Sequence, residues 1–121
     1  MVSLPSEDPA RRVADILRAI DRIRAYVADI GGLDALMRDE FLHRDAVERQ
    51  LLVVSEAAVK LRGQVDILEA EIDWHAIRGM GNVIRHNYDG VEDRVIRHVI
   101  AEELNVLKSA CERLLLRFNA P

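Results

Sequence analysis

The stretch VADILRAIDRIRAYVADI, residues 13–30, decides the fold class of this chain. Its large apolar residues return every three or four positions, which is the spacing of one face of an α-helix. Asp8 and Pro9 precede it as a helix start, because aspartate can cap free backbone N–H groups and proline suits the first helical position. Gly31 and Gly32 follow it and can end the helix. The sequence therefore predicts a long amphipathic helix that ends at residue 30.

The same helical spacing continues through the rest of the chain. The further predicted helices cover 33–41, about Asp45 to Gly63, 74–88, and a last one from about Glu92. Residues 65–72 form a connector that is either helical or irregular. No segment shows the alternation typical of a strand. We therefore predict one all-α domain over residues 1–121, an up-and-down helical bundle of four main helices and one or two short ones.

Composition narrows the class of protein. Half of the 121 residues are apolar and the formal net charge is −4, which argues against a wide basic surface for duplex nucleic acid but not against a small basic site. Cys111 is the only cysteine, so an internal disulfide is excluded. No apolar run approaches the roughly 18 residues of a membrane-spanning helix, and the N-terminus lacks the apolar region of a signal peptide. We expect a soluble, cytoplasmic protein that does not bind a membrane.

The candidate site lies in RGMGNVIRHNYDG, residues 78–90. Helical spacing places a polar stripe on one face, with His86 at its edge. The members of this stripe are Arg78, Asn82, Arg85 and Asp89. Histidine exchanges protons near neutral pH and arginine binds phosphate oxygens, so the pair can serve RNA cleavage without a metal. The four histidines lack a zinc-binding spacing, and we expect neither a metal nor a cofactor.

Each of these residues also has an ordinary interpretation. A histidine beside an arginine on a helix is usually structural or solvated, and a tyrosine before a turn, such as Tyr88, is usually a packing residue. Asp89 can orient His86 or belong to the turn. Gly79 and Gly81 each cost a helix up to about 1 kcal/mol relative to alanine, which predicts that another backbone, helix or ligand comes close. Spacing alone leaves the catalytic and the structural interpretation open.

Three segments resemble a known family. DWHAIRGMGNVIRHNYDGVE, residues 73–92, resembles the signature of HepT-like proteins, a branch of the HEPN superfamily. DAVERQLLVVSEAAVKL, residues 45–61, resembles the helix that precedes this signature, including Arg49 and Glu56, and residues 16–30 fit the first helix. The resemblance covers nearly the whole chain. It implies a helical bundle that forms a homodimer, in which the two copies of the motif face a shared cleft.

The resemblance also implies a function. HepT-like proteins are ribonuclease toxins of toxin–antitoxin pairs of type VII, and their partner is an MntA-type nucleotidyltransferase antitoxin that transfers AMP from ATP to the tyrosine of a His-x-Tyr motif. Carried over to this chain, His86 matches the family's histidine and Tyr88 the modified tyrosine. The family's arginine most often stands with four residues between it and the histidine, and Gly81 occupies that position here. Arg78 and Arg85 are the candidates to replace it.

Two functions follow from this comparison. The first is a metal-independent endoribonuclease toxin that acts on RNA through His86 with the help of an arginine. The second is a catalytically weak or inactive HEPN dimer that serves as binding partner and substrate of the nucleotidyltransferase. Gly81 in place of arginine favours the second function, whereas the retained His86-x-Tyr88 motif favours the first. A scaffold role unrelated to either is the third alternative, and the resemblance argues against it.

Overall fold

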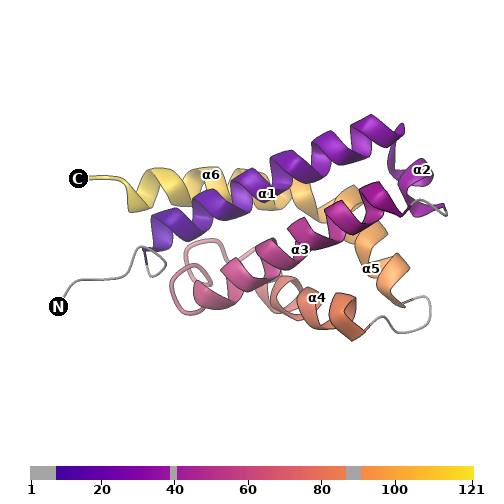
Figure 1. Cartoon of the computed structure of the whole chain (residues 1–121). Coiled ribbons are helices and arrows are strands. Elements are labelled where there is room, and N and C mark those ends of the chain that lie inside the picture. The colour runs from indigo at the N-terminus through magenta and orange to yellow at the C-terminus, as the bar shows by residue number, and fades with distance from the viewer. Residues whose placement is uncertain (1–7, 39–40, 87–90) are drawn as a thin grey trace.

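The computed structural model describes residues 8–38, 41–86 and 91–121, and within these ranges it contains helices and no strand. The helices are α1 (Pro9–Ile30), α2 (Leu33–Met37), α3 (Leu42–Lys60), α4 (Trp74–His86), α5 (Val91–His98), the π-helical turn η2 (Val99–Glu103) and α6 (Leu104–Phe118). Successive long helices run in opposite directions, and the start of α1 and the end of α6 lie at the same end of the bundle (Figure 1). The predicted all-α, up-and-down architecture is confirmed.

The start and end of α1 follow the predicted signals. The Asp8 carboxylate accepts a hydrogen bond from the Ala10 N–H at 3.0 Å, and Pro9 is the first helical residue. Gly31 and Gly32 have φ values of 102° and 118°, which side chains rarely tolerate. The N–H of Gly32 reaches back to the Val27 carbonyl at 2.8 Å. The glycine pair therefore closes the helix in the left-handed conformation that its sequence predicts.

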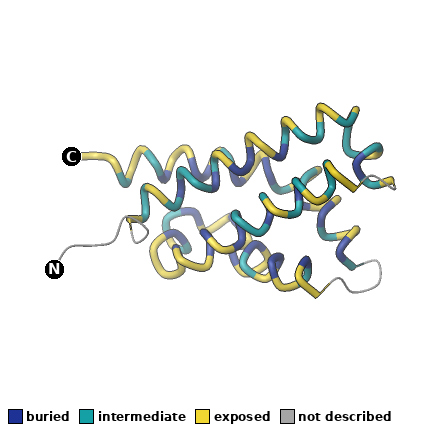
Figure 2. The backbone as a smooth tube through the Cα atoms, viewed as in Figure 1, coloured by how far each residue is buried: buried dark blue, intermediate teal, exposed yellow. Residues whose placement is uncertain are grey.

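The core lies between helix faces that are turned towards one another (Figure 2). α1 is central, because it packs against α3 on one side and α6 on the other, while α4 packs on the far side of α3. The fully buried side chains are mostly branched aliphatic ones, among them Ile16, Ile20, Ile23, Leu51, Leu107 and Leu114. Their burial is the main stabilising contribution to the fold. Among the described residues, no helix has both the length and the apolar character needed to cross a membrane.

Two helix boundaries differ from the prediction. α2 ends at Met37, because Arg38 already has an extended backbone with ψ of −167°. α3 runs from Leu42 to Lys60, so it ends before the predicted Gly63, whereas Asp45 lies near the start of the helix as predicted, in its first turn. The Asp45 N–H donates to the Phe41 carbonyl at 2.8 Å, which makes Phe41 the cap. Asp45 therefore acts as an acidic residue in the positive first turn rather than as the capping side chain.

The last predicted helix is interrupted. The Leu104 N–H bonds to the carbonyl of Val99, five residues earlier, which defines the π-helical turn η2 between α5 and α6. A π turn accommodates one more residue than an α turn. Ile96 of α5 and Leu107 of α6, on either side of it, are both buried. The one helix predicted from about Glu92 onward is thus divided into two, α5 and α6.

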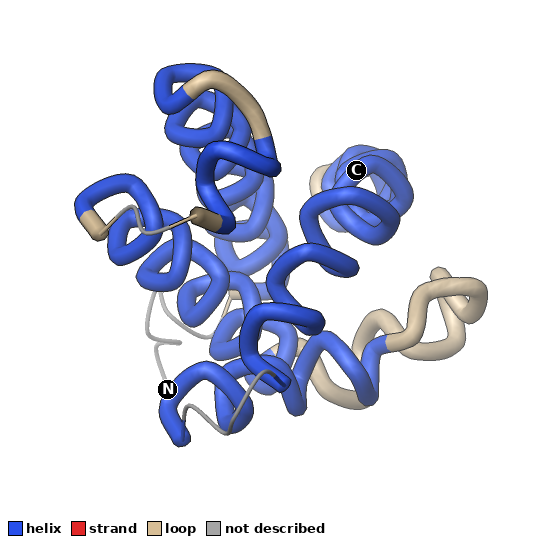
Figure 3. The backbone as a smooth tube through the Cα atoms, turned by 90° about the vertical axis from the view of Figure 1, so that its right-hand side faces the viewer, coloured by secondary structure: helices blue, strands red, loops and turns tan. Residues whose placement is uncertain are grey.

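The connector between α3 and α4, residues 61–73, is irregular and is the longest loop of the described chain (Figure 3). It consists of hydrogen-bonded turns, including Gln64 N–H to the Leu61 carbonyl and Glu69 N–H to the Val65 carbonyl, both at 2.9 Å. Val65 is fully buried. The carboxylate of Glu69 accepts three hydrogen bonds from Arg113 of α6, two from Nε at 3.1 Å and one from Nη2 at 2.6 Å. The connector is therefore held at a defined place beside the start of α4.

Candidate functional site

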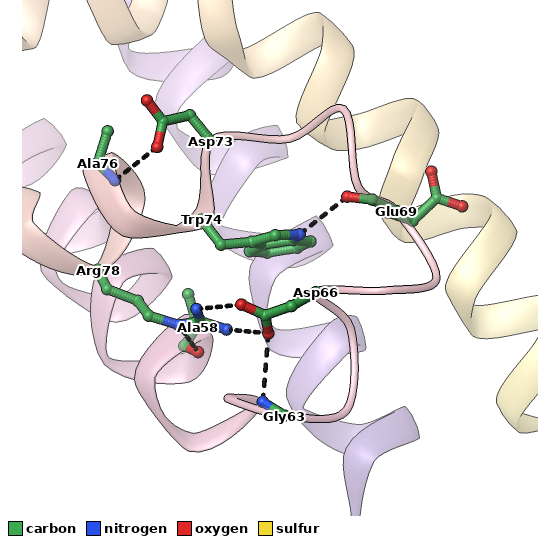
Figure 4. A network of polar contacts seen from close by, with 8 residues as sticks. All are labelled: Ala58, Gly63, Asp66, Glu69, Asp73, Trp74, Ala76 and Arg78. Carbon is green, nitrogen blue, oxygen red and sulfur yellow. Dashed lines mark hydrogen bonds and ion pairs between the residues drawn. The ribbon is translucent and has the colours of Figure 1, made fainter.

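The start of α4 is anchored to the connector (Figure 4). The Asp73 carboxylate accepts a hydrogen bond from the Ala76 N–H at 3.0 Å and so caps the helix. The Trp74 side chain is 3% exposed, and its indole N–H donates to the Glu69 carbonyl at 3.0 Å. Trp74 is therefore a core residue whose polar N–H has a partner. These contacts also fix the direction of the helix that carries the candidate site.

Arg78 is occupied by structural contacts. Its guanidinium donates two hydrogen bonds to the Asp66 carboxylate, both at 2.7 Å, and its Nε donates to the Ala58 carbonyl at 2.8 Å (Figure 4). It also lies 5.7 Å from the centre of the Trp74 ring. The Arg78 side chain is only 8% exposed. Hydrogen bonds from Arg78, and one from the N–H of Gly63, lower the pKa of Asp66 to about 2. Arg78 thus joins α3, the connector and α4.

Gly81 faces α3 at a point of close contact. The Gly81 N–H donates to the Ser55 hydroxyl at 3.1 Å, and this hydroxyl donates to the Arg78 carbonyl at 2.9 Å. A Cβ atom at position 81 would lie 2.8 Å from Ser55 Oγ and 3.2 Å from Ser55 Cβ. The neighbour that comes close to Gly81 is therefore Ser55, and no side chain fits at position 81 unless Ser55 moves or is replaced.

Gly79 has a different environment. It is exposed, and a Cβ atom at this position would meet no described atom within 4 Å. No described part of the chain itself therefore explains a glycine here. Gly79 instead lines an apolar groove of about 460 Å³ between α4 and α5, together with residues such as Met80, Val83 and Val95. The expected close approach at Gly79 stays a prediction about a second molecule.

Arg85 and His86 lie at the exposed end of α4. His86 is the last residue of the helix and is exposed. Arg85 is half exposed and donates one hydrogen bond to Glu56 of α3 at 3.1 Å. Its Nη1 lies 3.3 Å from the position that a Cβ atom of residue 81 would occupy. The guanidinium of Arg85 is therefore next to the place where a side chain at position 81 would begin.

The remaining predicted site residues divide into two groups. Asn82 is an exposed residue of α4, one turn before His86. Tyr88 and Asp89 lie outside the described residues, so their predicted roles stay predictions. Among the residues that the structure describes, no three His, Cys, Asp or Glu side chains are arranged to hold a metal ion. Cys111 is buried in α6, and burial raises the pKa of its thiol to about 12, which makes it unreactive.

A cluster of charges joins α3 to the start of α5, just beyond the residues that follow α4. Arg44 lies 3.2 Å from Glu48 and 4.0 Å from Glu92, and it also binds Asp93. Glu92 is buried. Burial and the neighbouring Glu92 carboxylate raise the pKa of Glu48 to about 7, against the opposing effect of Arg44. One arginine thus holds three carboxyl groups at this junction.

The sequence did not identify the partners of the two candidate arginines. Asp66 and Ser55 carry no signal by themselves, because their contacts with α4 depend on the path of the connector and on the register of α3 against α4. Glu56 was noted only through the family resemblance. A small residue such as Gly81 on a buried helix face is the one local signal, since it predicts a close neighbour without identifying it.

The sequence of the chain is similar to those of known proteins. Residues 16–114 match the model of a family described as ribonuclease HepT-like. A protein of Thermococcus cleftensis named "Probable ribonuclease HepT" is 30% identical over 102 residues, which cover 83% of this chain and 89% of that protein. No solved structure matches the chain. The matched range includes all of α4, and with it Arg85 and His86.

Proposed function

This chain belongs to the HepT-like ribonuclease family, and from that premise we propose that it is a metal-independent endoribonuclease toxin in which His86 and Arg85 carry the reaction. The proposal extends the family membership to named residues. It also decides between the two arginines that the sequence left as candidates. Arg85 is the better candidate, because Arg78 is already bound to Asp66 and Ala58 and is nearly inaccessible to a substrate.

The position of the Arg85 guanidinium is the observation that carries this proposal. Its Nη1 lies 3.3 Å from where a Cβ of residue 81 would be, and residue 81 is the position at which the family most often has its arginine. A guanidinium group thus lies beside position 81, contributed from the next turn of the helix. An exposed ion pair such as Arg85–Glu56 contributes only about 0–1 kcal/mol, so an RNA phosphate can compete with Glu56 for Arg85.

The proposed reaction is a transesterification within RNA. The 2′-hydroxyl oxygen attacks the adjacent phosphorus, the bond from phosphorus to the 5′-oxygen of the next nucleotide breaks, and a 2′,3′-cyclic phosphate and a 5′-hydroxyl result. His86 transfers a proton at the reacting oxygens, and Arg85 stabilises the negative charge that builds on the phosphate oxygens. Both side chains are exposed at the end of α4, where a strand of RNA has access.

A second function is supported by Glu56. In it, the chain is a weak or inactive HEPN dimer that serves mainly as partner and substrate of the nucleotidyltransferase. Glu56 neutralises Arg85 at 3.1 Å, and Ser55 occupies the space beside position 81, so the charge that would act on a phosphate is reduced. This alternative predicts a stable complex with the nucleotidyltransferase and no cleavage of RNA.

The homodimer stays part of the proposal. His86 shares a helix face with Gly79 and Val83, which lie seven and three residues before it, and both line the apolar groove between α4 and α5. A second copy seated in this groove would bring two His86 side chains to one cleft. Replacing Val83 with glutamate should then convert a dimer to a monomer in light scattering coupled to gel filtration, whereas replacing the exposed Leu116 of α6 should not.

Regulation by AMP transfer also stays a proposal. The Tyr88 oxygen would attack the α-phosphorus of ATP in the partner's site, releasing pyrophosphate and leaving AMP on the tyrosine. A phenol is a weak nucleophile at neutral pH, so the partner must activate it. Intact-mass measurement after incubation with an MntA-type nucleotidyltransferase and ATP should show added AMP, and Tyr88→Phe should abolish it. An active partner that leaves the wild-type mass unchanged would remove this mechanism.

The proposed function is tested most directly at His86. His86→Ala should reduce the rate of RNA cleavage by about 10²–10⁴ and should abolish growth arrest when the chain is expressed alone. His43→Ala is a matched control, because His43 pairs with Asp29 of α1 rather than lying on α4. Undiminished cleavage by His86→Ala would contradict the proposal. Absence of cleavage by the wild-type chain, with a stable complex with the nucleotidyltransferase, would favour the second function.

A further inference from the structure

A polar groove lies on the surface between α1 and α3, which run side by side in opposite directions (Figure 1). It has a volume of about 230 Å³. α1 contributes Arg18 and Arg22, and α3 contributes Arg49 and the amide side chain of Gln50. The groove thus collects three guanidinium groups from two helices in a chain whose net charge is −4.

The positive charge of this groove is largely unneutralised. Asp15 is its one acidic lining residue, and Arg18 binds that carboxylate. Arg22 and Arg49 are exposed, and neither makes an ion pair or a side-chain hydrogen bond with any described residue. Several other surface arginines of the described chain, including Arg85, Arg97 and Arg113, are paired with carboxylates. Two unpaired guanidinium groups facing one groove therefore favour an anionic ligand.

We propose that this α1/α3 groove binds the phosphate backbone of the RNA strand that is cleaved at His86, an inference that rests on the proposed ribonuclease function. Arginine binds phosphate through two N–H groups at once, and Gln50 adds an uncharged donor. The apolar part of the groove consists only of Ala19 and Val53. Protein partners are usually held by a central group of aromatic or large apolar side chains, which is absent from this lining.

α3 connects the groove to the proposed site. Arg49 lies seven residues before Glu56, which places the two on the same face of α3, two turns and about 10 Å apart. Glu56 in turn contacts Arg85 at 3.1 Å. A strand that crosses the outer face of α3 would therefore meet Arg49 and the α1 arginines on one side and Arg85 on the other. The small extent of the groove fits a single strand rather than a duplex.

Binding and cleavage are measured separately to test this inference. A fluorescently labelled single-stranded RNA is titrated with His86→Ala protein at several salt concentrations, with and without Arg22→Gln and Arg49→Gln. The double substitution should weaken binding about tenfold or more and lower the salt slope by about 1.4, since each phosphate contact on a single strand contributes about 0.7. Arg62→Gln with Arg117→Gln is the matched control, because both arginines are exposed, unpaired among the described residues and outside the groove.

The outcomes separate this inference from the proposed function. Equal weakening by the groove pair and the control pair, or no RNA binding at all, would overturn the groove assignment. RNA cleavage that is unaffected by the groove substitutions would overturn it while leaving the ribonuclease function intact. Groove-dependent binding without cleavage by the wild-type chain would support the groove and contradict the ribonuclease function. If the groove variant lost binding to the nucleotidyltransferase but bound RNA as the wild-type chain does, the groove would be assigned to a protein partner and the inference would be overturned.

Discussion

The two ends of α4 differ in how they are held. At its start, Asp73, Trp74 and Arg78 are joined to the connector and to α3 by hydrogen bonds, and Trp74 and Arg78 are almost inaccessible. At its end, Arg85 makes one exposed ion pair, and His86 is exposed. The same helix thus has one half that stabilises the bundle and one half that is accessible to a substrate. Two arginines seven residues apart accordingly have different roles.

Among the substitutions that compare the two ends of α4, replacing Arg85 should produce the largest effect on activity. Arg85→Ala should lower the rate of RNA cleavage by about 10²–10³, as expected for a group aimed at a developing charge. The free energy of unfolding should change by no more than about 1 kcal/mol, because the Arg85–Glu56 pair is exposed. Kinetics and urea unfolding of the same preparation measure both quantities, and Arg117→Ala serves as control. A large loss of stability without loss of activity would reverse the assignment of the two arginines.

Replacing Arg78 should lower stability and leave the cleavage rate nearly unchanged, which is the opposite of the result expected for Arg85. Arg78→Ala removes three hydrogen bonds and leaves the Ala58 carbonyl and the Asp66 carboxylate without their partner. We expect the free energy of unfolding to fall by about 2–3 kcal/mol, since hydrogen bonds to charged groups contribute about 1.5–3 kcal/mol. Cleavage per folded molecule should stay within a few-fold of wild type. Asp66→Asn is the companion variant, and a smaller loss of stability is expected for it.

The contact between Gly81 and Ser55 lies between the two halves of α4, and its tightness can be tested by substitution. Gly81→Ala places a Cβ atom 2.8 Å from Ser55 Oγ, and overpacking of this kind costs about 1–3 kcal/mol. Ser55→Gly removes both close atoms, so the double variant should be more stable than the sum of the single effects predicts. A double-mutant cycle by urea unfolding measures this coupling. Strict additivity would show that the helices adjust without strain at this point.

The smallest expected effect concerns the junction of α3 and α5. The pKa of Glu48 is about 7 in the folded chain, above its ordinary value of 4.5, so the folded state binds the extra proton between these pH values. Stability therefore falls as pH rises from about 4.5 to 7. Glu48→Gln should raise Tm by about 2–4 °C at pH 8 and by little at pH 4.5. Thermal unfolding at both pH values measures this, with Glu112→Gln on the exposed face of α6 as control.

The helices were predictable because their signals are local. The apolar spacing of residues 13–30, the Asp8-Pro9 start and the Gly31-Gly32 end each act within a few residues of the chain. The sequence could not show which of the two candidate arginines is available to a substrate. Arg78 is held by Asp66, and Asp66 lies on an irregular connector whose path has no local sequence signal. Helical spacing placed Arg78 and Arg85 on one stripe and gave no reason to prefer either. The choice between them depends on tertiary contacts.

The candidate site was predictable only in part. His86 was identified by its residue type and by the family resemblance, and the structure places it at the accessible end of α4. The groove was not predicted, although Arg49 was noted through the family resemblance, because Arg22 and Arg49 lie 27 residues apart and line one groove only after α1 and α3 have packed. A charge pattern that spans two helices carries no periodic signal in the sequence.

The π-helical turn η2 takes up one residue of chain length without changing the direction of α5. It holds one residue more than an α turn, because the hydrogen bond from the Leu104 N–H to the Val99 carbonyl spans five residues instead of four. Deleting one residue from it, such as Ala101, would allow α5 and α6 to form one regular α-helix, in which Glu92 would still face Arg44 and Ile96 would still face the core. In a regular α-helix, by contrast, the same deletion rotates the preceding residues by about 100° about the helix axis. A single-codon deletion should therefore be tolerated better within this turn than elsewhere in α5 or α6.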